Sequence, residues 1–313
     1  MLRRAAGLLL LSFPLLAQVT FEQSPDRIKV QVDGKPFTEL FIGDDVRKPY
    51  LYPLVTATGK RITRHYPMEQ MAGETKDHPH HRGLWFNHGD VNKVDFWGSD
   101  PLAKQDAGAK ISVKKIRSVK GGKKSGTIVG DFEWQEPNGT VLLTEQRTMT
   151  FYSDPKNRTV DIDILLKAVK PVTFGDTKEG SFGIRLADQI KEGKGGNGKM
   201  RNAEGKVGEK EVWGRPSPWV DYVGTLDGEQ VGVAILDHPS NPGHPTHWHA
   251  RAYGLFAANI FGLHDFYNDK SKDGSRSLKP GETMRFRYRV VIHPGDTDAA
   301  NIAQEFTKFA AMK

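Results

Sequence analysis

Histidines gather in two short segments of this 313-residue sequence. Segments 77–97 and 237–251 together hold eight of the eleven histidines, and both open with Asp-His-Pro. Each also contains tryptophan and arginine. Imidazole changes charge near neutral pH and binds metals, so a site that needs acids, bases or metal ligands would collect it. The pattern predicts one functional site to which both segments contribute, provided that they meet in space.

Acid–base chemistry is the first interpretation of this site. A histidine can transfer protons, and a nearby guanidinium can hold a carboxylate or a hydroxyl. We predict a catalytic set of His80, His81, Arg82 and Asp90. The residues predicted to bind substrate are Trp85, Asn87, His88, Trp97, His244 and Arg251. Tryptophan rings stack on the C–H faces of sugars, although core packing is their more common fate, and Arg82 and Arg251 could equally form structural ion pairs.

Metal binding is the second interpretation. Residues two apart on a strand point to the same face, which could pair His78 with His80 and His247 with His249. Four facing imidazoles would suit one divalent metal such as Zn, Fe, Cu or Mn. The alternative is that these histidines hydrogen-bond to the loop backbone and stack on aromatic rings. The identity of any cofactor stays open.

The elements that must position these residues are strands. Alternating apolar and polar residues predict strands at 27–32, 141–152, 160–168 and 284–292. Asp33-Gly34 and Asp227-Gly228 predict hairpin turns. The sequence therefore predicts an all-β fold: a large antiparallel β-sandwich, in the style of galactose mutarotases, formed as a single domain by residues 18–313.

Two other stretches differ from this strand pattern. Ile302, Phe306 and Phe309 recur at helical spacing, which predicts a short C-terminal helix capped by Asp296 or Thr297. The span 191–210 is rich in glycine and lysine, and its stretch 193–199 is predicted to be a mobile flap within a polar loop.

Composition and the N-terminus limit the protein classes further. A basic pair, a short apolar run and a small residue predict a secretory signal peptide over residues 1–17 and a secreted or periplasmic bacterial protein. The run is well short of the ~20 residues that span a bilayer, so no membrane span is expected in the mature chain. The sequence lacks cysteine, which excludes disulfides. The net charge is +7, but the lysines are dispersed, so we expect no nucleic-acid partner.

Several long motifs resemble one bacterial family. They are Asp77–Trp97, Gly180–Leu186, Trp219–Tyr222, Asp237–Arg251, Tyr253–Asn259 and Phe286–His293. The chain resembles the PmoA family, whose members carry the label "methane oxygenase PmoA" and are also described as a domain of unknown function. The label implies oxygenase chemistry. A methane monooxygenase subunit of that name is an integral membrane protein, however, and this chain has no spanning helix after its signal.

These observations leave three functions open. We favour a secreted carbohydrate-active protein that binds or transforms a small-molecule or oligosaccharide substrate in a cleft lined by His, Arg and Trp. The first alternative is a histidine-ligated metalloenzyme of the oxygenase type, which the resemblance implies. The second is a noncatalytic glycan-binding module that depends on its tryptophans.

Overall fold

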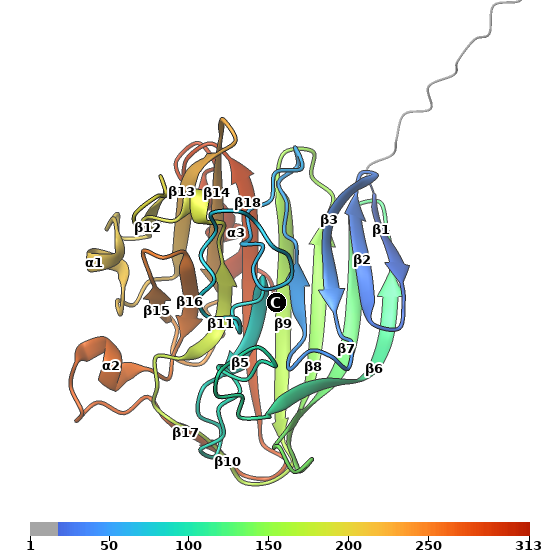
Figure 1. Ribbon diagram of the computed structural model, residues 1–313, viewed down its shortest axis with the longest axis vertical. Coiled ribbons are helices and arrows are strands. Elements are labelled where there is room, and N and C mark those ends of the chain that lie inside the picture. The colour runs from blue at the N-terminus through green and yellow to red at the C-terminus, as the bar shows by residue number, and fades with distance from the viewer. Residues whose placement is uncertain (1–17) are drawn as a thin grey trace, which may run out of the picture.

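Two large antiparallel sheets face each other in the computed structural model, which describes residues 18–313 (Figure 1). Each sheet has eight strands, and a separate two-stranded sheet lies at one end. The predicted antiparallel β-sandwich is therefore confirmed. The predicted signal peptide, residues 1–17, lies outside the described residues.

The first sheet contains a part of each histidine-rich segment, namely β5 from segment 77–97 and β15 from segment 237–251. Its strands follow the order β1-β2-β3-β4-β5-β11-β16-β15. Their bounds are β1 Val19–Gln23, β2 Arg27–Val32, β3 Lys35–Phe41, β4 Tyr50–Tyr52, β5 Leu84–His88, β11 Gly180–Arg185, β15 His247–Ala250 and β16 Leu255–Asn259. β2 and β3 form the hairpin predicted around Asp33-Gly34.

The second sheet contains the longest strands and follows the order β12-β13-β14-β18-β9-β8-β7-β6. Their bounds are β6 Lys110–Lys120, β7 Ser125–Gln135, β8 Val141–Tyr152, β9 Arg158–Ala168, β12 Lys199–Asn202, β13 Trp219–Leu226, β14 Glu229–Asp237 and β18 Thr283–Pro294. The small third sheet pairs β10, Val172–Phe174, with β17, Arg276–Leu278, which lies far along the chain. The period-two stretches found in the sequence fall in β2 of the first sheet and in β8, β9 and β18 of the second, because their alternate residues face the core.

Aromatic contacts between the facing sheets hold the sandwich together. Phe86 of β5 meets Trp134 of β7 edge to face at 5.9 Å between ring centroids, and it also contacts Phe286 of β18 at 5.4 Å. Phe182 of β11 stacks on Tyr288 of β18 at 4.5 Å. These rings are fully buried, and burial of such large apolar surfaces is the main term that stabilises the fold.

The helices are few and short. They are the 3₁₀ helix η1 Asp188–Ile190, α1 Glu209–Val212, α2 Leu263–Tyr267 and α3 Ile302–Ala310. α3 is the predicted C-terminal helix, and its Ile302 and Phe309 are buried against Trp219 and Leu236 on the outer face of the second sheet. Its cap differs from the prediction, because the residue before the helix is Asn301, in left-handed conformation, and not Asp296 or Thr297.

The span 191–210 is more ordered than its composition predicts. It contributes β12, which pairs with β13 at the edge of the second sheet, and the start of α1. Met200 of β12 is fully buried in the core. Part of the predicted polar loop is therefore an edge strand, Lys199–Asn202, which the composition of the span did not indicate.

The outer face of the first sheet is where the long connections fold. Neighbouring strands place Tyr50, Trp85, Gly183, Ala257 and His249 in one row across this face. The connection 53–83 lies over the middle of the sheet, and the connection 89–109 lies at the lower end of β5, next to β10 (Figure 1). Because Gly183 and Ala257 are small, they leave room on the face for side chains that these connections supply.

A buried ion pair inside the sandwich gives a test of the packing. The Glu145 carboxylate accepts hydrogen bonds from Arg147 Nε at 2.6 Å and Trp134 Nε1 at 2.8 Å. Glu145→Ala would leave the Arg147 cation buried without its partner, so we expect a loss of about 3–5 kcal/mol in the free energy of unfolding. Denaturant unfolding measures it.

The matched control is Asp163→Ala, which breaks an ion pair with the half-exposed Arg285. A loss of under about 1 kcal/mol is expected there. Equal losses in the two variants would contradict the assignment of Glu145 to the core.

Candidate functional site

The Asp77 carboxylate anchors the first histidine segment to the sheet. It pairs with Arg64 from the connection after β4, with Arg185 Nη2 of β11 at 2.7 Å and with His78 Nδ1 at 3.1 Å. Both arginine side chains are fully buried. Partial burial alone would raise the pKa of Asp77, but the bond to His78 and the two guanidinium charges hold it well below its usual range. Asp77 is therefore ionised. Its ion pairs fix the position of the backbone from which His78 and the following residues continue.

Four rings continue from this anchor as a stack. Tyr253 lies parallel to His78 at 5.3 Å, His78 lies parallel to His81 at 4.8 Å, and His81 stacks on Trp85 at 5.2 Å. Trp97 closes the cluster at 5.1 Å from Trp85. A Cβ atom on Gly183 would lie 3.1 Å from both indoles, so a larger residue would force the rings to shift by a few tenths of an ångström. The stack explains how loop histidines come to lie against the sheet.

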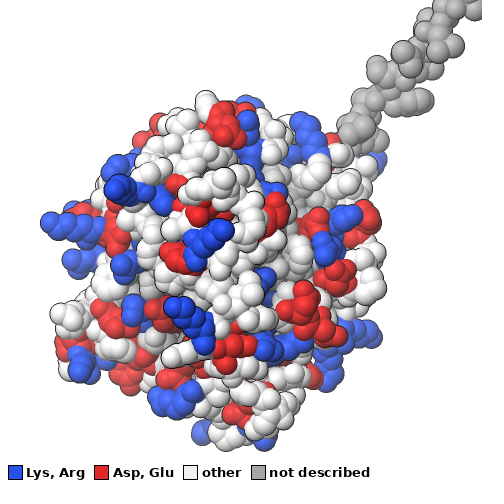
Figure 2. Space-filling view, in the orientation of Figure 1, with Lys and Arg blue, Asp and Glu red and all other residues white. Residues whose placement is uncertain are grey.

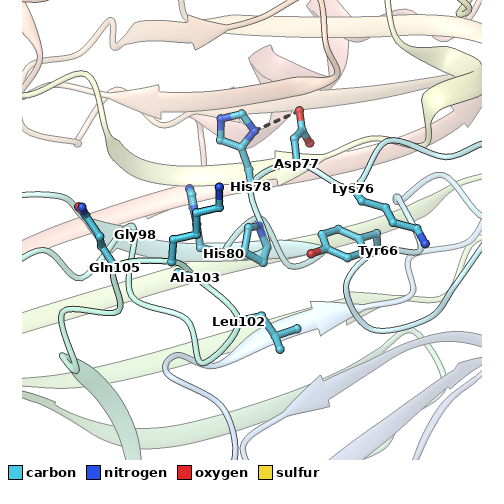
Figure 3. A pocket seen from close by; sticks show the side chains of 11 residues that line it. Tyr66, Lys76, Asp77, His78, His80, Gly98, Leu102, Ala103 and Gln105 are labelled. Carbon is cyan, nitrogen blue, oxygen red and sulfur yellow. Dashed lines mark ion pairs between the residues drawn. The ribbon is translucent and has the colours of Figure 1, made fainter.

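A pocket of about 450 Å³ opens beside this stack (Figure 3). Its walls come from three stretches of the chain. The lining residues are Tyr66, Lys76, Asp77, His78, Pro79, His80, Gly98, Leu102, Ala103, Lys104 and Gln105. The Tyr66 hydroxyl points toward the His80 ring in this view. Pockets of roughly 300–1,000 Å³ are typical of small-molecule sites.

His80 lines this pocket with an imidazole whose ring nitrogens are free to contact a ligand. Burial first, and then the positive charges of Lys48, Arg64 and Arg185, lower its pKa to about 3. The imidazole is therefore neutral at physiological pH. Neither ring nitrogen has a hydrogen-bond partner among residues 18–313. His80 thus offers a lone pair and an N–H group to a ligand.

Behind His80 lies a set of buried N–H groups. The His81 ring meets His80 edge to face at 4.4 Å. Arg185 Nη1 donates to His81 Nδ1 at 3.2 Å, which places the proton of the neutral ring on Nε2. His81 Nε2, Trp85 Nε1 and Trp97 Nε1 are all buried and have no acceptor among the described residues. Each such unmatched donor costs on the order of 1–3 kcal/mol.

Lys48 holds the backbone of one wall of the pocket in place. This lysine is buried, and its Nζ donates to the carbonyl oxygens of Trp97 and Ser99, each at 3.3 Å. Burial lowers its pKa to about 8 despite the attraction of Asp100. The two bonds hold the backbone on either side of Gly98, which lines the pocket.

Several residues predicted for the site lie elsewhere in the first segment. Arg82 forms a two-point ion pair with the buried Asp100, at 2.5 Å and 2.9 Å. Asp90 accepts from the backbone N–H and the Nζ of Lys93 in a turn. Their placement corrects the predicted catalytic grouping with His80, because their polar atoms are already engaged in structural bonds.

Two more residues that were predicted to bind substrate are buried within strand β5. His88 lies in the core between Phe174 and Phe261, and its Nε2 bonds to the Gly175 carbonyl at 2.8 Å. Asn87 Nδ2 donates to Phe96 O at 2.6 Å. Trp85 and Trp97 are buried as well, so their faces are closed to a sugar ring. The predicted open tryptophan platform is wrong.

The second histidine segment is divided between two faces of the molecule. His244 pairs with Asp237 at 2.7 Å and stacks on Phe306 of α3, on the outer side of the second sheet. His247 stacks on Phe266 of α2. These contacts remove both residues from the predicted shared site.

Only the end of the second segment reaches the first. Arg251 Nε lies 2.9 Å from Glu209 Oε1, and its guanidinium lies 5.7 Å from the Tyr253 ring, which stacks on His78. His249 lies on the same sheet face as Trp85, three strands or about 14 Å away. The two segments therefore meet through Tyr253, a residue just beyond the predicted range.

The four candidate metal ligands do not converge. His78 and His80 lie 5.6 Å apart between ring centroids, whereas His247 contacts α2 and His249 Nδ1 donates to the Lys178 carbonyl at 2.7 Å. Within residues 18–313, no three histidine, aspartate or glutamate side chains come together as a metal site would require. The predicted four-histidine ligand set is not assembled.

Sequence reasoning missed five residues that shape the site, namely Lys48, Arg64, Tyr66, Arg185 and Tyr253. Only Arg185 carried a usable signal. It is a charged residue at the end of an otherwise apolar strand, and such a residue needs a partner when it is buried. The others lie in connections whose path over the sheet has no local signature.

Together these features define a β-sandwich protein with a polar pocket built on the outer face of one sheet. The chain belongs to the family of unknown function DUF6807, which it matches over residues 27–307. A comparison with curated proteins finds no match.

Among solved structures, the chain is similar to an alpha-galactosidase from Lactobacillus brevis at 12% identity and a TM-score of 0.43. That match covers 93% of this chain but only 41% of the alpha-galactosidase. It is also similar to a galactose mutarotase-like protein from Lactobacillus casei ATCC 334, at 9% identity and a TM-score of 0.43, over 88% of this chain and all of that one. Similarities this distant assign no activity.

None of the helices in residues 18–313 combines the length and apolar character needed to cross a bilayer. Charged side chains of both signs are interspersed on the face shown in Figure 2. We therefore see no continuous basic surface on that face.

Buried histidines predict how stability depends on pH. Burial lowers the pKa of His81 strongly and those of His88 and His249 to about 4. Between about pH 6.5 and pH 4 the unfolded chain binds protons that these folded residues do not, so the free energy of unfolding should fall on acidification. His293 acts oppositely, because Asp221 raises its pKa despite burial.

Urea unfolding at pH 7.5 and pH 5 measures this effect, and we expect a loss on the order of 1–2 kcal/mol for each histidine with a lowered pKa. His88→Gln should reduce the difference in the free energy of unfolding between pH 7.5 and pH 5 by the contribution of one histidine. Equal stability at the two pH values would contradict the neutral, buried state of these histidines.

Proposed function

We propose that this protein binds a sugar in the pocket beside the His78–Trp85 stack and transforms it by proton transfer, with His80 as the acid–base residue. The observation that carries the proposal is the state of His80. It is neutral at physiological pH, it lines a pocket of small-molecule size, and its ring nitrogens have no partner within residues 18–313. A neutral imidazole with free nitrogens keeps a lone pair for a proton of the ligand. With a pKa of about 3 it is a weak base by itself, and a bound anion that offsets the nearby cations would raise that pKa.

The lining of the pocket supports a polyhydroxylated ligand. Hydrogen-bonding groups project from Tyr66, Lys76, His78, Lys104 and Gln105 around a small volume. A sugar presents several hydroxyl groups at short spacing, and each needs a donor or an acceptor once water leaves. Apolar walls are also present at Pro79, Leu102 and Ala103, and these can contact the C–H groups of a pyranose ring.

The two other functions that the sequence left open have less support. A glycan-binding module would need exposed aromatic faces, and Trp85 and Trp97 are 1% and 2% exposed. A histidine-ligated metalloenzyme would need ligands that converge, which His78, His80, His247 and His249 do not. Export by the predicted signal peptide remains part of the proposal and would give the protein access to extracellular or periplasmic sugars.

The test is to incubate the protein in D₂O with a panel of neutral and acidic mono- and disaccharides and to follow them by proton NMR. Proton transfer at carbon would replace C–H signals by deuterium, and catalysed ring opening would speed the approach of a freshly dissolved pure anomer to its equilibrium anomeric ratio. His80→Asn should slow the reaction at least about a hundredfold, since a positioned acid or base contributes typically 10²–10⁴-fold.

His247→Asn is the matched control, because His247 packs on α2 away from the pocket. It should leave the rate within about twofold. A His80→Asn variant that folds normally and keeps the full rate would disprove the assignment of His80.

A further inference from the structure

The pocket carries more positive than negative charge. Lys76 and Lys104 both line it, and neither lies within ion-pair distance of a carboxylate in residues 18–313. The one carboxylate in the lining is Asp77, and it is already shared by Arg64, Arg185 and His78. No acidic group of the lining is therefore left to balance the two lysines.

Charges under the pocket surface act in the same direction. Arg64 and Arg185 are two buried cations with Asp77 as their only ion-pair partner among the described residues. Lys48 lies close enough to His80 to lower its pKa, as do both arginines. Three positive charges thus lie close enough to the histidine that meets the ligand to act on it.

The unmatched hydrogen-bonding groups behind His80 are mostly donors. The N–H groups of His81, Trp85 and Trp97 have no acceptor among the described residues, and two acceptors farther along β5, Asn87 Oδ1 and His88 Nδ1, are unmatched as well. Ser181 Oγ, which can serve either way, is the pairing neighbour of Asn87. These buried groups do not line the pocket, so the preference for a ligand with anionic oxygen atoms rests on the cations in and under its lining.

A second pocket shows that this excess is a local property. It measures about 610 Å³ and lies between η1, the 71–74 turn and the β13–β14 turn. Its charges are largely matched, since Lys191 pairs with Asp188 at 2.9 Å and His65 pairs with Glu74 at 3.1 Å. The overall positive charge of the chain is therefore not spread evenly over its pockets.

We infer that the ligand of the His80 pocket is an anionic sugar, with Lys76 and Lys104 binding its charged group. This inference rests on the proposed function and narrows it to one substrate class. The chemistry shared by the candidate ligands is an anionic oxygen on a sugar ring, supplied by the carboxylate of a uronic acid, by a sulfate ester or by a phosphate ester.

The experiment is isothermal titration calorimetry of the full chain with matched sugars. Glucuronate and galacturonate are compared with glucose and galactose, and glucose 6-sulfate and glucose 6-phosphate identify which anion is preferred. We expect at least one anionic sugar to bind ten times more tightly than its neutral counterpart, and its affinity to fall between 50 and 500 mM salt.

Variants locate the effect. The double change Lys76→Gln and Lys104→Gln should weaken the anionic sugar at least tenfold and leave the neutral sugar within twofold. Lys194→Gln, at a lysine that lines the second pocket, should change neither affinity. The thermal midpoint of each variant shows whether it is folded, and both lysines of the double change are exposed, so folding should persist.

The possible failures can be told apart. If neutral sugars bind as tightly as anionic ones, or if the double variant binds the anionic sugar normally, the inference is wrong while the proposed function stands. If no sugar binds and none is transformed in the NMR assay, both are wrong. Preference for the sulfate or phosphate over the uronates would support the inference and identify the anion.

Discussion

The site depends on one carboxylate held between two buried arginines. Asp77 reaches across from the histidine segment to Arg64, in the connection after β4, and to Arg185, on β11. Three parts of the chain that are distant in sequence are thereby fixed at one point. A buried guanidinium without its partner is costly, typically 3–5 kcal/mol, so none of the three can move away alone. The positions of His78, His80 and His81 follow from this constraint.

The same cations explain the chemical character of His80. An imidazole on an open surface would be partly charged near neutral pH. Here the ring is partly buried and lies among Lys48, Arg64 and Arg185, and both effects oppose a further positive charge. The positive charges of the two arginines therefore have two effects. They stabilise the loop through Asp77, and they keep His80 neutral. Removing either arginine would disturb both properties together.

The strands and the terminal helix could be predicted from sequence because their signals are local. Alternation over 141–152 reflects which side of β8 meets the core, and no distant residue is needed to see it. The concentration of histidines also pointed correctly to His78, His80 and His81 as neighbours. These three residues are adjacent in a tight turn, where sequence proximity guarantees proximity in space.

The division of the second histidine segment could not be predicted. Asp237 ends β14 in the second sheet, whereas His247 begins β15 in the first. The chain crosses between sheets within ten residues, so His244 and His249 are placed on different faces although they are near in sequence. The burial of Trp85 was equally hidden, because it results from connections that cover the outer face of the first sheet. Sheet order and loop path are non-local properties.

The close seat of Trp97 on Gly183 has a thermodynamic consequence for recognition. One wall of the pocket is continuous with a packed cluster of rings, and Lys48 ties the backbone beside Gly98 to that cluster. A flexible wall would lose conformational entropy whenever a ligand ordered it. Because this wall is already ordered, that loss is incurred once, during folding. A ligand can then bind without reordering the wall beside Gly98, and a molecule that does not fit this wall gains little from it.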